Sequence, residues 1–489
     1  MTKQALQRIE TGVRNLDAVL HGGLPKGTVS VFGGSPGAGK TILAQQICFH
    51  NASAEQRALW FGTLSEPTAK TLRYLSEFSF FDSSKVESGA VQFVDLGVIL
   101  RSTGLEETAK LIMQNVKKFK PALVVIDSFK VFDDLAKSRE EHRKFCYELA
   151  VQLMAWETTS MLLGEYSPND MASNPMFSVV DGLLMLTQRE QSGEQQRLLQ
   201  VVKMRGTDHS RDEYPFVITS AGLEVFAPDV TIQRNASADH VPAARVETGI
   251  SELDGLLGEG IPRGSSLLVA GASGTGKTVI LLEFLYRGAQ AGEKGILFSF
   301  EETEERLLAT ARGLGWDLDA EIARGMVEIV FIPQPDILVD GDLLMMKERI
   351  DAVAAKRVAV DSVSVFLHKI EKPSSVRTKI FQLATVVQNV GAVGFFATDI
   401  PYGANQLSRF GVEETVVDGV FLLSATEEGT ERQRYLEVYK LRNTAHVTGR
   451  HEMLIRTGGI TVFPHDDAAA APTKARPKPR GRTKPRRRS

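Results

Sequence analysis

The sequence predicts an α/β protein of two tandem domains, each with a mostly parallel sheet flanked by helices. The chain has 489 residues, more than one hydrophobic core usually serves. It also repeats itself, because seven anchor residues recur at a constant distance of 237 positions. The pairs are Arg8 and Arg245, Gly12 and Gly249, Asp17 and Asp254, Pro25 and Pro262, Lys40 and Lys277, Asp181 and Asp418, and Lys203 and Lys440. Within each copy, apolar runs typical of buried strands alternate with helical patterns, which favours a parallel sheet.

These anchors predict a first domain at residues 1–230, a polar linker at 231–241, a second domain at 242–465 and a tail at 466–489. The composition, 43% hydrophobic and 24% charged, is typical of a soluble globular protein. The sequence has neither an apolar run long enough for a membrane span nor a signal-peptide core at its start. Its two cysteines, Cys48 and Cys146, have no metal-ligand spacing. We therefore expect a cytoplasmic protein without disulfides or a zinc site.

Each copy carries a glycine-rich loop that fits G-x-x-x-x-G-K-[ST], placed between an apolar strand and a helical pattern. Backbone N–H groups converge on a phosphate in such a loop, and the helix N-terminus behind it favours negative charge. The lysine is expected to reach the β- and γ-phosphates of a nucleotide. The predicted nucleotide-binding residues are Gly34, Ser35, Pro36, Gly37, Ala38, Gly39, Lys40 and Thr41 in the first copy, and Gly271, Ala272, Ser273, Gly274, Thr275, Gly276, Lys277 and Thr278 in the second.

Magnesium ligands are predicted from two positions in each copy. Thr41 and Thr278, which end the loops, would offer a hydroxyl group to Mg²⁺. A later apolar run ends in Asp127 in the first copy and in Asp361 in the second. A carboxylate at that place is expected to hold Mg²⁺, partly through water. A strand-ending aspartate is also a common turn former, so the metal prediction depends on its pairing with the phosphate loop.

A second strand in each copy is followed by acidic residues. They are Glu301 and Glu302 in the second copy, whereas the first has Ser65 and Glu66. A carboxylate there would orient the attacking water and accept its proton, so we predict catalytic roles for Glu301, Glu302 and Glu66. The alternative is that these acids complement the dipole of a helix N-terminus. Because serine cannot act as a carboxylate base, the first site is expected to hydrolyse more slowly or to rely on Glu66.

A basic cluster recurs near the end of each copy. Its members are Lys203, Arg205 and His209 in the first copy and Lys440, Arg442 and His446 in the second. One interpretation is a solvated strand edge protected by charge. The recurrence favours another, in which these side chains reach the phosphates bound by a neighbouring subunit, like an arginine finger.

Together these motifs resemble the KaiC family, the double-domain RecA-like P-loop ATPases of bacterial circadian clocks and their relatives. The resemblance covers about Arg8 to Phe463 and includes both loops, the Glu301 and Glu302 pair, the strand-ending aspartates and the K-[ML]-R-x-T-x-H segments. It implies tandem RecA-like domains, ATP and Mg²⁺ as ligands, and a homohexamer whose sites are closed by the neighbour's basic cluster. A head-to-tail interface with rotational closure also produces a ring. KaiB-like or two-component signalling proteins are the implied partners.

The second domain of this family can carry serine/threonine autokinase activity, directed at an adjacent Ser-Thr pair that here reads Glu414-Thr415. The resemblance therefore implies that Thr415 accepts phosphate, while Glu414 carries a fixed negative charge. The alternative is a structural threonine flanked by acids. The first copy has Phe177-Ser178 at the matching place, so no phosphorylation is expected there.

The C-terminal tail is strongly basic. Residues 474–489 contain nine Lys or Arg and no acid, which against an overall charge of −3 leaves −12 on the rest of the chain. Prolines exclude a continuous helix, so we expect a disordered polycation. It differs from the C-terminal peptide that family members present to KaiA, which makes KaiA an unexpected partner. The tail would bind nucleic acid or an acidic partner, or fold back on the acidic body.

Two other functions share the same ATPase core. A RecA-like DNA motor would use the basic tail on DNA, but the body is acidic and shows no obvious DNA-binding module. A nucleotide-switched scaffold would hydrolyse little ATP, which Ser65 favours for the first ring. The sequence favours an ATP-hydrolysing signalling protein with autokinase activity in its second domain.

Overall fold

The computed structural model describes residues 6–63, 68–97, 99–100, 104–191, 194–234, 244–258, 260–401, 406–428 and 431–464. The chain forms two compact units, Met1–Thr231 and Ile232–Ser489. Helix α11 (Pro228–Thr231) ends the first unit, so a helix reaches the start of the segment expected to be a linker. Ser65, Glu66 and the basic tail lie outside the described residues.

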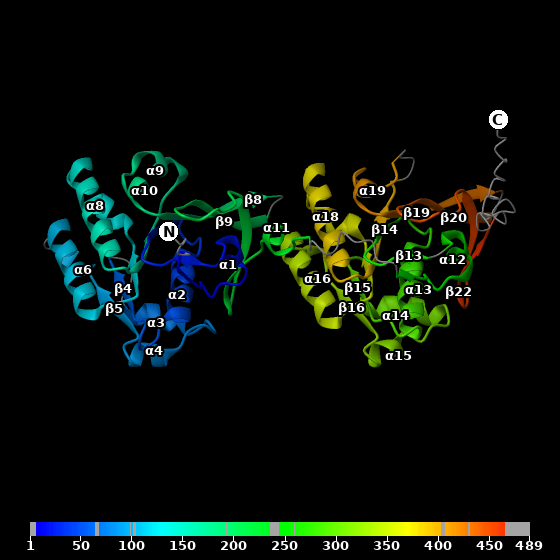
Figure 1. The fold of residues 1–489 in the computed structure, drawn as a ribbon, viewed down its shortest axis with the longest axis horizontal. Helices are drawn as coiled ribbons and strands as arrows, with labels where there is room; N and C mark the ends of the chain where they lie inside the picture. The colour runs from blue at the N-terminus through cyan, green and yellow to red at the C-terminus, as the bar shows by residue number, and fades with distance from the viewer. Residues whose placement is uncertain are drawn as a thin grey trace, which may run out of the picture. The chain divides into compact units, whose positions relative to one another are not determined.

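A nine-stranded sheet forms the centre of the first unit (Figure 1). Its strand order is β11-β10-β9-β8-β3-β7-β6-β4-β5. The strands from β8 to β5 in this order are parallel, and β9, β10 and β11 extend the sheet in antiparallel fashion. The strands are β3 (Val29–Gly34), β4 (Ala58–Gly62), β5 (Val91–Asp95), β6 (Leu123–Asp127), β7 (Thr159–Gly164), β8 (Gly182–Gln191), β9 (Glu194–Met204), β10 (Glu213–Thr219) and β11 (Gly222–Val225). A separate two-stranded sheet pairs β1 (Arg8–Ile9) with β2 (Leu24–Pro25).

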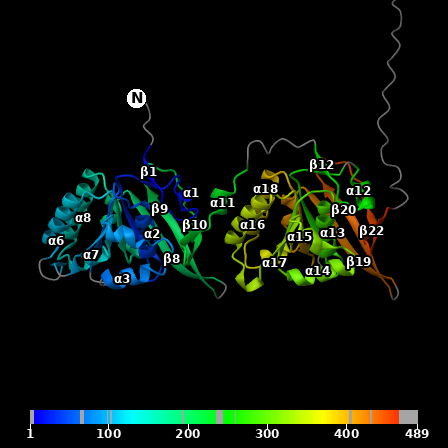
Figure 2. The ribbon, with the colours of Figure 1, turned by 90° about the horizontal axis from the view of Figure 1, so that it is seen from below.

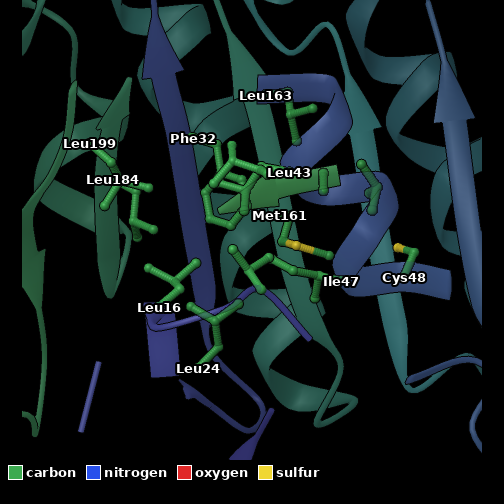
Figure 3. Close-up of a cluster of buried hydrophobic side chains, with 14 of the residues drawn as sticks. Leu16, Leu24, Phe32, Leu43, Ile47, Cys48, Met161, Leu163, Leu184 and Leu199 are labelled. Carbon is green, nitrogen blue, oxygen red and sulfur yellow. The ribbon is translucent and has the colours of Figure 1, made fainter. Parts of the chain in front are cut away.

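Helices cover both faces of this sheet because its central strands are apolar on both sides. On one face, Phe32 and Met161 from the strands meet Leu43 and Ile47 of α2 (Figure 3). On the other face lie α6 and α8, which run side by side in Figures 1 and 2. The helices are α1 (Leu16–Val19), α2 (Lys40–Asn51), α3 (Thr68–Leu75), α4 (Ser83–Glu87), α6 (Leu105–Phe119), α7 (Lys130–Leu135), α8 (Arg139–Ala155), α9 (Pro168–Ser173) and α10 (Met176–Val179).

The second unit has a matching sheet, with the order β16-β15-β17-β18-β14-β19-β20-β21-β22. Its strands are β14 (Ser266–Gly271), β15 (Gly295–Ser299), β16 (Val327–Phe331), β17 (Arg357–Asp361), β18 (Val393–Asp399), β19 (Gly419–Glu428), β20 (Glu431–Leu441), β21 (Arg450–Arg456) and β22 (Gly459–Phe463), with β12 (Arg245–Val246) and β13 (Ile261–Pro262) forming a two-stranded sheet. Its helices are α12 (Ser251–Leu257), α13 (Lys277–Gln290), α14 (Glu304–Gly313), α15 (Leu318–Ala323), α16 (Val339–Val353), α17 (Val363–Phe366), α18 (Pro373–Asn389) and α19 (Glu413–Val416). The two mostly parallel sheets flanked by helices confirm the predicted fold class.

The repeated anchor residues explain why both halves adopt one architecture. Asp181 accepts a hydrogen bond from the backbone N–H of Val29 at 3.1 Å, and Asp418 does the same for Ser266 at 3.0 Å. Each aspartate therefore fixes the first residue of the strand that leads into the phosphate loop. Asp254 likewise accepts a 2.6 Å hydrogen bond from the Thr248 N–H, which shapes the turn before α12. None of the described helices is long and apolar enough to span a bilayer.

Two candidate nucleotide sites

Both phosphate loops lie between the end of a central strand and the start of a helix. The first follows β3 and leads into α2 at Lys40, and the second follows β14 and leads into α13 at Lys277. The residue before each helix, Gly39 or Gly276, has a φ of 101° or 108°. An L side chain rarely adopts this conformation, so glycine is required at that turn. The backbone N–H groups of a first helical turn have no acceptor within the helix, which suits them to bind a phosphate.

The lysine of each loop contacts the loop itself. The ammonium group of Lys40 donates to the carbonyl oxygens of Gly34 and Ser35 at 3.0 and 2.8 Å. That of Lys277 donates to those of Gly271 and Ala272 at 3.0 and 3.2 Å. Burial lowers the pKa of Lys40 below its ordinary value, although negative charge on Glu165 and Asp127 acts in the opposite direction. Both lysines are therefore positioned by the loop that they are predicted to serve.

A threonine–aspartate pair stands beside each loop. The Thr41 hydroxyl donates to the Asp127 carboxylate at 2.9 Å, and the Thr278 hydroxyl donates to that of Asp361 at 2.7 Å. Burial raises the pKa of Asp361 to about 6, and Thr278 counteracts this by donating its hydrogen bond. These oxygens suit Mg²⁺, which prefers hard oxygen ligands and keeps several waters and nucleotide phosphates around it. Among the described residues, no group of three His, Cys, Asp or Glu side chains is arranged to hold a metal ion.

The two acids of the second copy lie next to this pair. Strand β15 pairs with β17 so that Ser299 lies opposite Asp361. The residues that follow β15 therefore lie beside the Thr278–Asp361 pair. The hydroxyl group of Ser362, the residue after Asp361, donates to Glu301 at 2.6 Å. Helix α14 begins only at Glu304, so Glu304 and Glu305 occupy its first turn, where acids complement the helix dipole. Glu301 and Glu302 precede the helix.

The basic clusters lie at the ends of β9 and β20, beyond the residues at which these strands pair with β10 and β21. Strand β9 runs between β8 and β10, and β20 runs between β19 and β21. The Lys440 ammonium group donates to the carbonyl oxygens of Glu414 and Val417 at 3.0 and 2.7 Å, and Lys203 makes the matching contacts with Phe177 and Val180 at 3.2 and 2.5 Å. Each lysine is therefore held by backbone carbonyl oxygens of its own unit. Burial lowers the pKa of both lysines, with the neighbouring arginine acting in the same direction.

The other cluster members are more accessible. Arg442 lies 3.6 Å from Asp418 with about half of its side chain exposed, and Arg205 lies 3.2 Å from Asp181. His446 and His209 each place Nδ1 3.2 Å from the carbonyl oxygen two residues earlier, that of Thr444 or Thr207. The arginines are therefore the members of the cluster that a neighbouring chain could reach most easily.

Thr415 lies in the short helix α19, where its side chain is exposed and donates to the Val412 carbonyl oxygen at 2.6 Å. A cleft of about 380 Å³ opens beside it. The cleft is lined by Arg377, Thr378 and Phe381 of α18, by Thr415 and Val416, and by Arg442. The threonine is therefore reachable and has two guanidinium groups nearby.

The acid two residues before Thr415 has a structural role. Glu413 is fully buried and accepts hydrogen bonds from the Ser408 hydroxyl at 2.6 Å and from the Val412 N–H at 3.1 Å. Thr398, near the end of β18, donates to it at 3.3 Å. The same Ser408 hydroxyl lies 2.5 Å from the Glu414 carboxylate, so the two acids share its single proton. Glu413 thus anchors α19 to the core of the second unit.

We expect Glu413→Ala to lower the free energy of unfolding of the second unit by about 3 kcal/mol, because buried donors lose their acceptor. Denaturant unfolding followed by circular dichroism would measure it. Glu414→Ala is the control, because its carboxylate is partly exposed, and should cost less than about 1 kcal/mol. Equal losses from the two changes would contradict the role given to Glu413.

One pair of acids at the sites was not predicted from the sequence. Asp399, the last residue of β18, lies with Oδ1 2.9 Å from Nζ of Lys277. Glu165, which follows β7, is the charge that acts most strongly to raise the pKa of Lys40. These two acids are 234 positions apart, the distance that also separates Asp127 from Asp361. This second offset was the signal that could have revealed them.

Tandem parallel sheets, each with a phosphate loop on its central strand and a Thr–Asp pair beside it, define a double-domain P-loop ATPase of the RecA-like class. A family model described as the KaiC ATPase matches residues 9–230 and again 246–467. The circadian clock oscillator protein KaiC of Picosynechococcus sp. is 27% identical over 94% of this chain and 90% of its own length. The circadian clock protein KaiC3 of Synechocystis sp. is 28% identical over 94% of this chain and 92% of its own. The chain belongs to the KaiC family.

Proposed function

We propose that both domains bind Mg-ATP and that the second hydrolyses it with Glu301 as the general base and Glu302 as its support. The observation that carries this proposal is the proximity of two hydrogen bonds, from Thr278 to Asp361 and from Ser362 to Glu301, because Asp361 and Ser362 are consecutive at the end of β17. Mg²⁺ would supply positive charge to the phosphate oxygens. Incubating the full chain with Mg-ATP, and measuring ADP release and phosphorylation on the same sample, tests it.

The hydrolysis step requires little of the protein beyond placement and charge. Glu301 takes a proton from a water molecule, whose oxygen bonds to the γ-phosphorus while the bond to the β–γ bridging oxygen breaks. Lys277 offsets the negative charge on the β- and γ-phosphates, and ADP and phosphate leave. In the first domain, Lys40, Thr41 and Asp127 hold Mg-ATP in the same way, and Glu66 acts without a second glutamate because position 65 is serine.

The oligomer that we propose is a homohexamer with nucleotide between subunits. The basic clusters support it, because Arg205 and Arg442 lie beyond the ends of β9 and β20 and are about half exposed. A mass measurement in solution with and without Mg-ATP tests the assembly. A monomer under both conditions would contradict it.

We further propose that the second domain transfers the γ-phosphate of ATP to the hydroxyl oxygen of Thr415. A neighbouring subunit's carboxylate at position 301 or 302 accepts the hydroxyl proton, and ADP leaves. The exposed hydroxyl and the adjacent Arg377 and Arg442 support this, because guanidinium groups recognise phosphate well.

Mass spectrometry after incubation with Mg-ATP should then find phosphothreonine at position 415. The Thr415→Ala variant should show none there, and Thr378 in the same cleft is the internal control that should stay unmodified. A wild-type chain without phosphate at Thr415, but with active ATP hydrolysis, would contradict the kinase proposal and leave the ATPase proposal standing.

The similarity to circadian clock proteins supports a signalling role, with KaiB-like or two-component proteins as partners. We infer that Glu414 gives this relative a permanent negative charge beside Thr415, so that one modified residue suffices for regulation. Nucleic acid would be bound only through the basic tail. An ATPase rate unaffected by single-stranded DNA would support the signalling role over that of a DNA motor.

A further inference from the structure

Lys277 uses its hydrogen-bonding capacity on groups of its own chain. Its ammonium group has three N–H donors. Two reach the carbonyl oxygens of Gly271 and Ala272, and the third side of the group faces the Asp399 carboxylate at 2.9 Å. Phosphates that approach this lysine compete with a carboxylate for the same cation. The carbonyl oxygens are dipoles, so Asp399 is the stronger competitor.

Asp399 is held in this position. It ends β18, which pairs in register with the phosphate-loop strand so that Asp399 lies opposite Gly271. Its backbone N–H donates to the Ser364 hydroxyl at 2.9 Å, and that hydroxyl also lies 3.4 Å from Oδ2. About 30% of the side chain is exposed. The carboxylate is therefore a fixed anion, not a mobile surface group.

The same serine connects Asp399 to the proposed general base. The Ser364 hydroxyl lies 3.2 Å from that of Ser362, which donates to Glu301 at 2.6 Å. A continuous hydrogen-bonded group thus joins the loop lysine to the catalytic acid. In the first copy the position of Ser364 is taken by Lys130, which pairs with Asp133 at 3.1 Å. Glu165 of the first site therefore lacks this connection.

We propose that Asp399 sets the nucleotide affinity of the second site by competing with the β- and γ-phosphates for Lys277. This rests on the proposed binding of Mg-ATP at that site. The fixed negative charge weakens binding of both nucleotides, and ATP more than ADP because the γ-phosphate adds charge near the carboxylate. Asp399 is a positioning and affinity-setting residue, and its role is distinct from that of the catalytic Glu301.

Equilibrium binding of Mg-ATP and Mg-ADP to the full chain tests the proposal. Asp399→Asn keeps an acceptor for Ser364 and removes the charge. It should tighten Mg-ATP binding to the second-domain sites by about tenfold or more, with a smaller gain for Mg-ADP. The first-domain sites should keep their affinity. Asp399→Glu, which restores a carboxylate, should bring the affinity back toward the wild-type value. The gain should shrink at high salt.

Two controls make the result specific. Glu165→Gln is the matched change in the first domain and should change the nucleotide affinity of the first-domain sites only. Asp351→Asn removes a carboxylate that is paired with Lys347 at 2.9 Å on α16, and should change neither affinity. Circular dichroism of each variant checks that it is folded.

The outcomes separate this inference from the function on which it rests. A wild-type chain that binds no nucleotide would overturn the proposed function. If the wild type binds nucleotide but folded Asp399→Asn binds Mg-ATP with the same or lower affinity, the role of Asp399 is overturned alone. Asp399→Ala provides a second test, because it removes the carboxylate altogether and should also tighten binding.

Discussion

Replacing Glu301 and Glu302 together by glutamine is expected to lower ATP hydrolysis by the second domain about 10²- to 10⁴-fold, the usual contribution of a general base. Glutamine at position 301 still accepts the hydrogen bond from Ser362 but takes no proton from water. Nucleotide binding should persist, because Lys277, Thr278 and the loop are unchanged. ADP release at saturating Mg-ATP and equilibrium binding of Mg-ATP measure the two quantities.

The first domain needs its own control because both sites contribute to ADP release. Glu66→Gln is the matching change there, so the two variants and their combination divide the total rate between the sites. Glu304→Gln, which alters an acid in the first turn of α14, should leave the rate unchanged. Unchanged ATP turnover in the Glu301 and Glu302 double variant would remove the assignment of the base.

The sequence was sufficient to predict the layers of both units. Strand and helix periodicities are local, and the constant offset of the anchors required both halves to share one architecture. The phosphate loops and the Thr–Asp pairs were also predictable, since a loop of this type fixes its own backbone and points at a neighbouring strand end. The geometry at Thr278 and Asp361, 2.7 Å apart, is what that pattern implies.

Two features of the second unit were not predicted from local sequence patterns. Asp399 looks like any acid after a strand, and its partner Lys277 is found only once β18 is placed beside β14. Glu413 looks like a solvated neighbour of Thr415, yet it is fully buried, because the segment before α19 folds over it and supplies Ser408 as a donor. Both cases depend on contacts with β18 that form only in the folded chain, since Asp399 meets Lys277 and Thr398 meets Glu413.

The basic cluster shows a third kind of limit. Its recurrence predicted an important role, but alternation along a strand could not separate Lys440 from Arg442. In the structure the lysine is engaged by two carbonyl oxygens of its own unit, whereas the arginine lies beyond β20 with half its side chain exposed. Arg442 is therefore the better candidate to act on a neighbouring subunit.

Arg442→Ala is expected to lower ATP turnover by the second domain about 10³-fold, as the loss of an arginine finger does. If the arginine acts on a neighbour, mixing this variant with the Glu301 and Glu302 double variant should restore activity. Some interfaces in a mixed ring then join an intact base to an intact arginine. With equal amounts and random assembly, about a quarter of the second-domain sites are complete.

The mixing experiment is done by combining the chains before Mg-ATP is added and following ADP release, with Glu66→Gln in every chain to reduce the first-domain rate. Arg450→Ala is the control and should keep full activity. Arg450 is exposed, and its ion pair with Glu437 is long at 3.9 Å. Mixed rings, identified by mass, that remain inactive would place the action of Arg442 within its own subunit. The reference is the rate of the chain that carries Glu66→Gln alone. Recovery to about a quarter of this rate requires that the arginine of one chain completes the site of another, because neither variant alone contains a complete site.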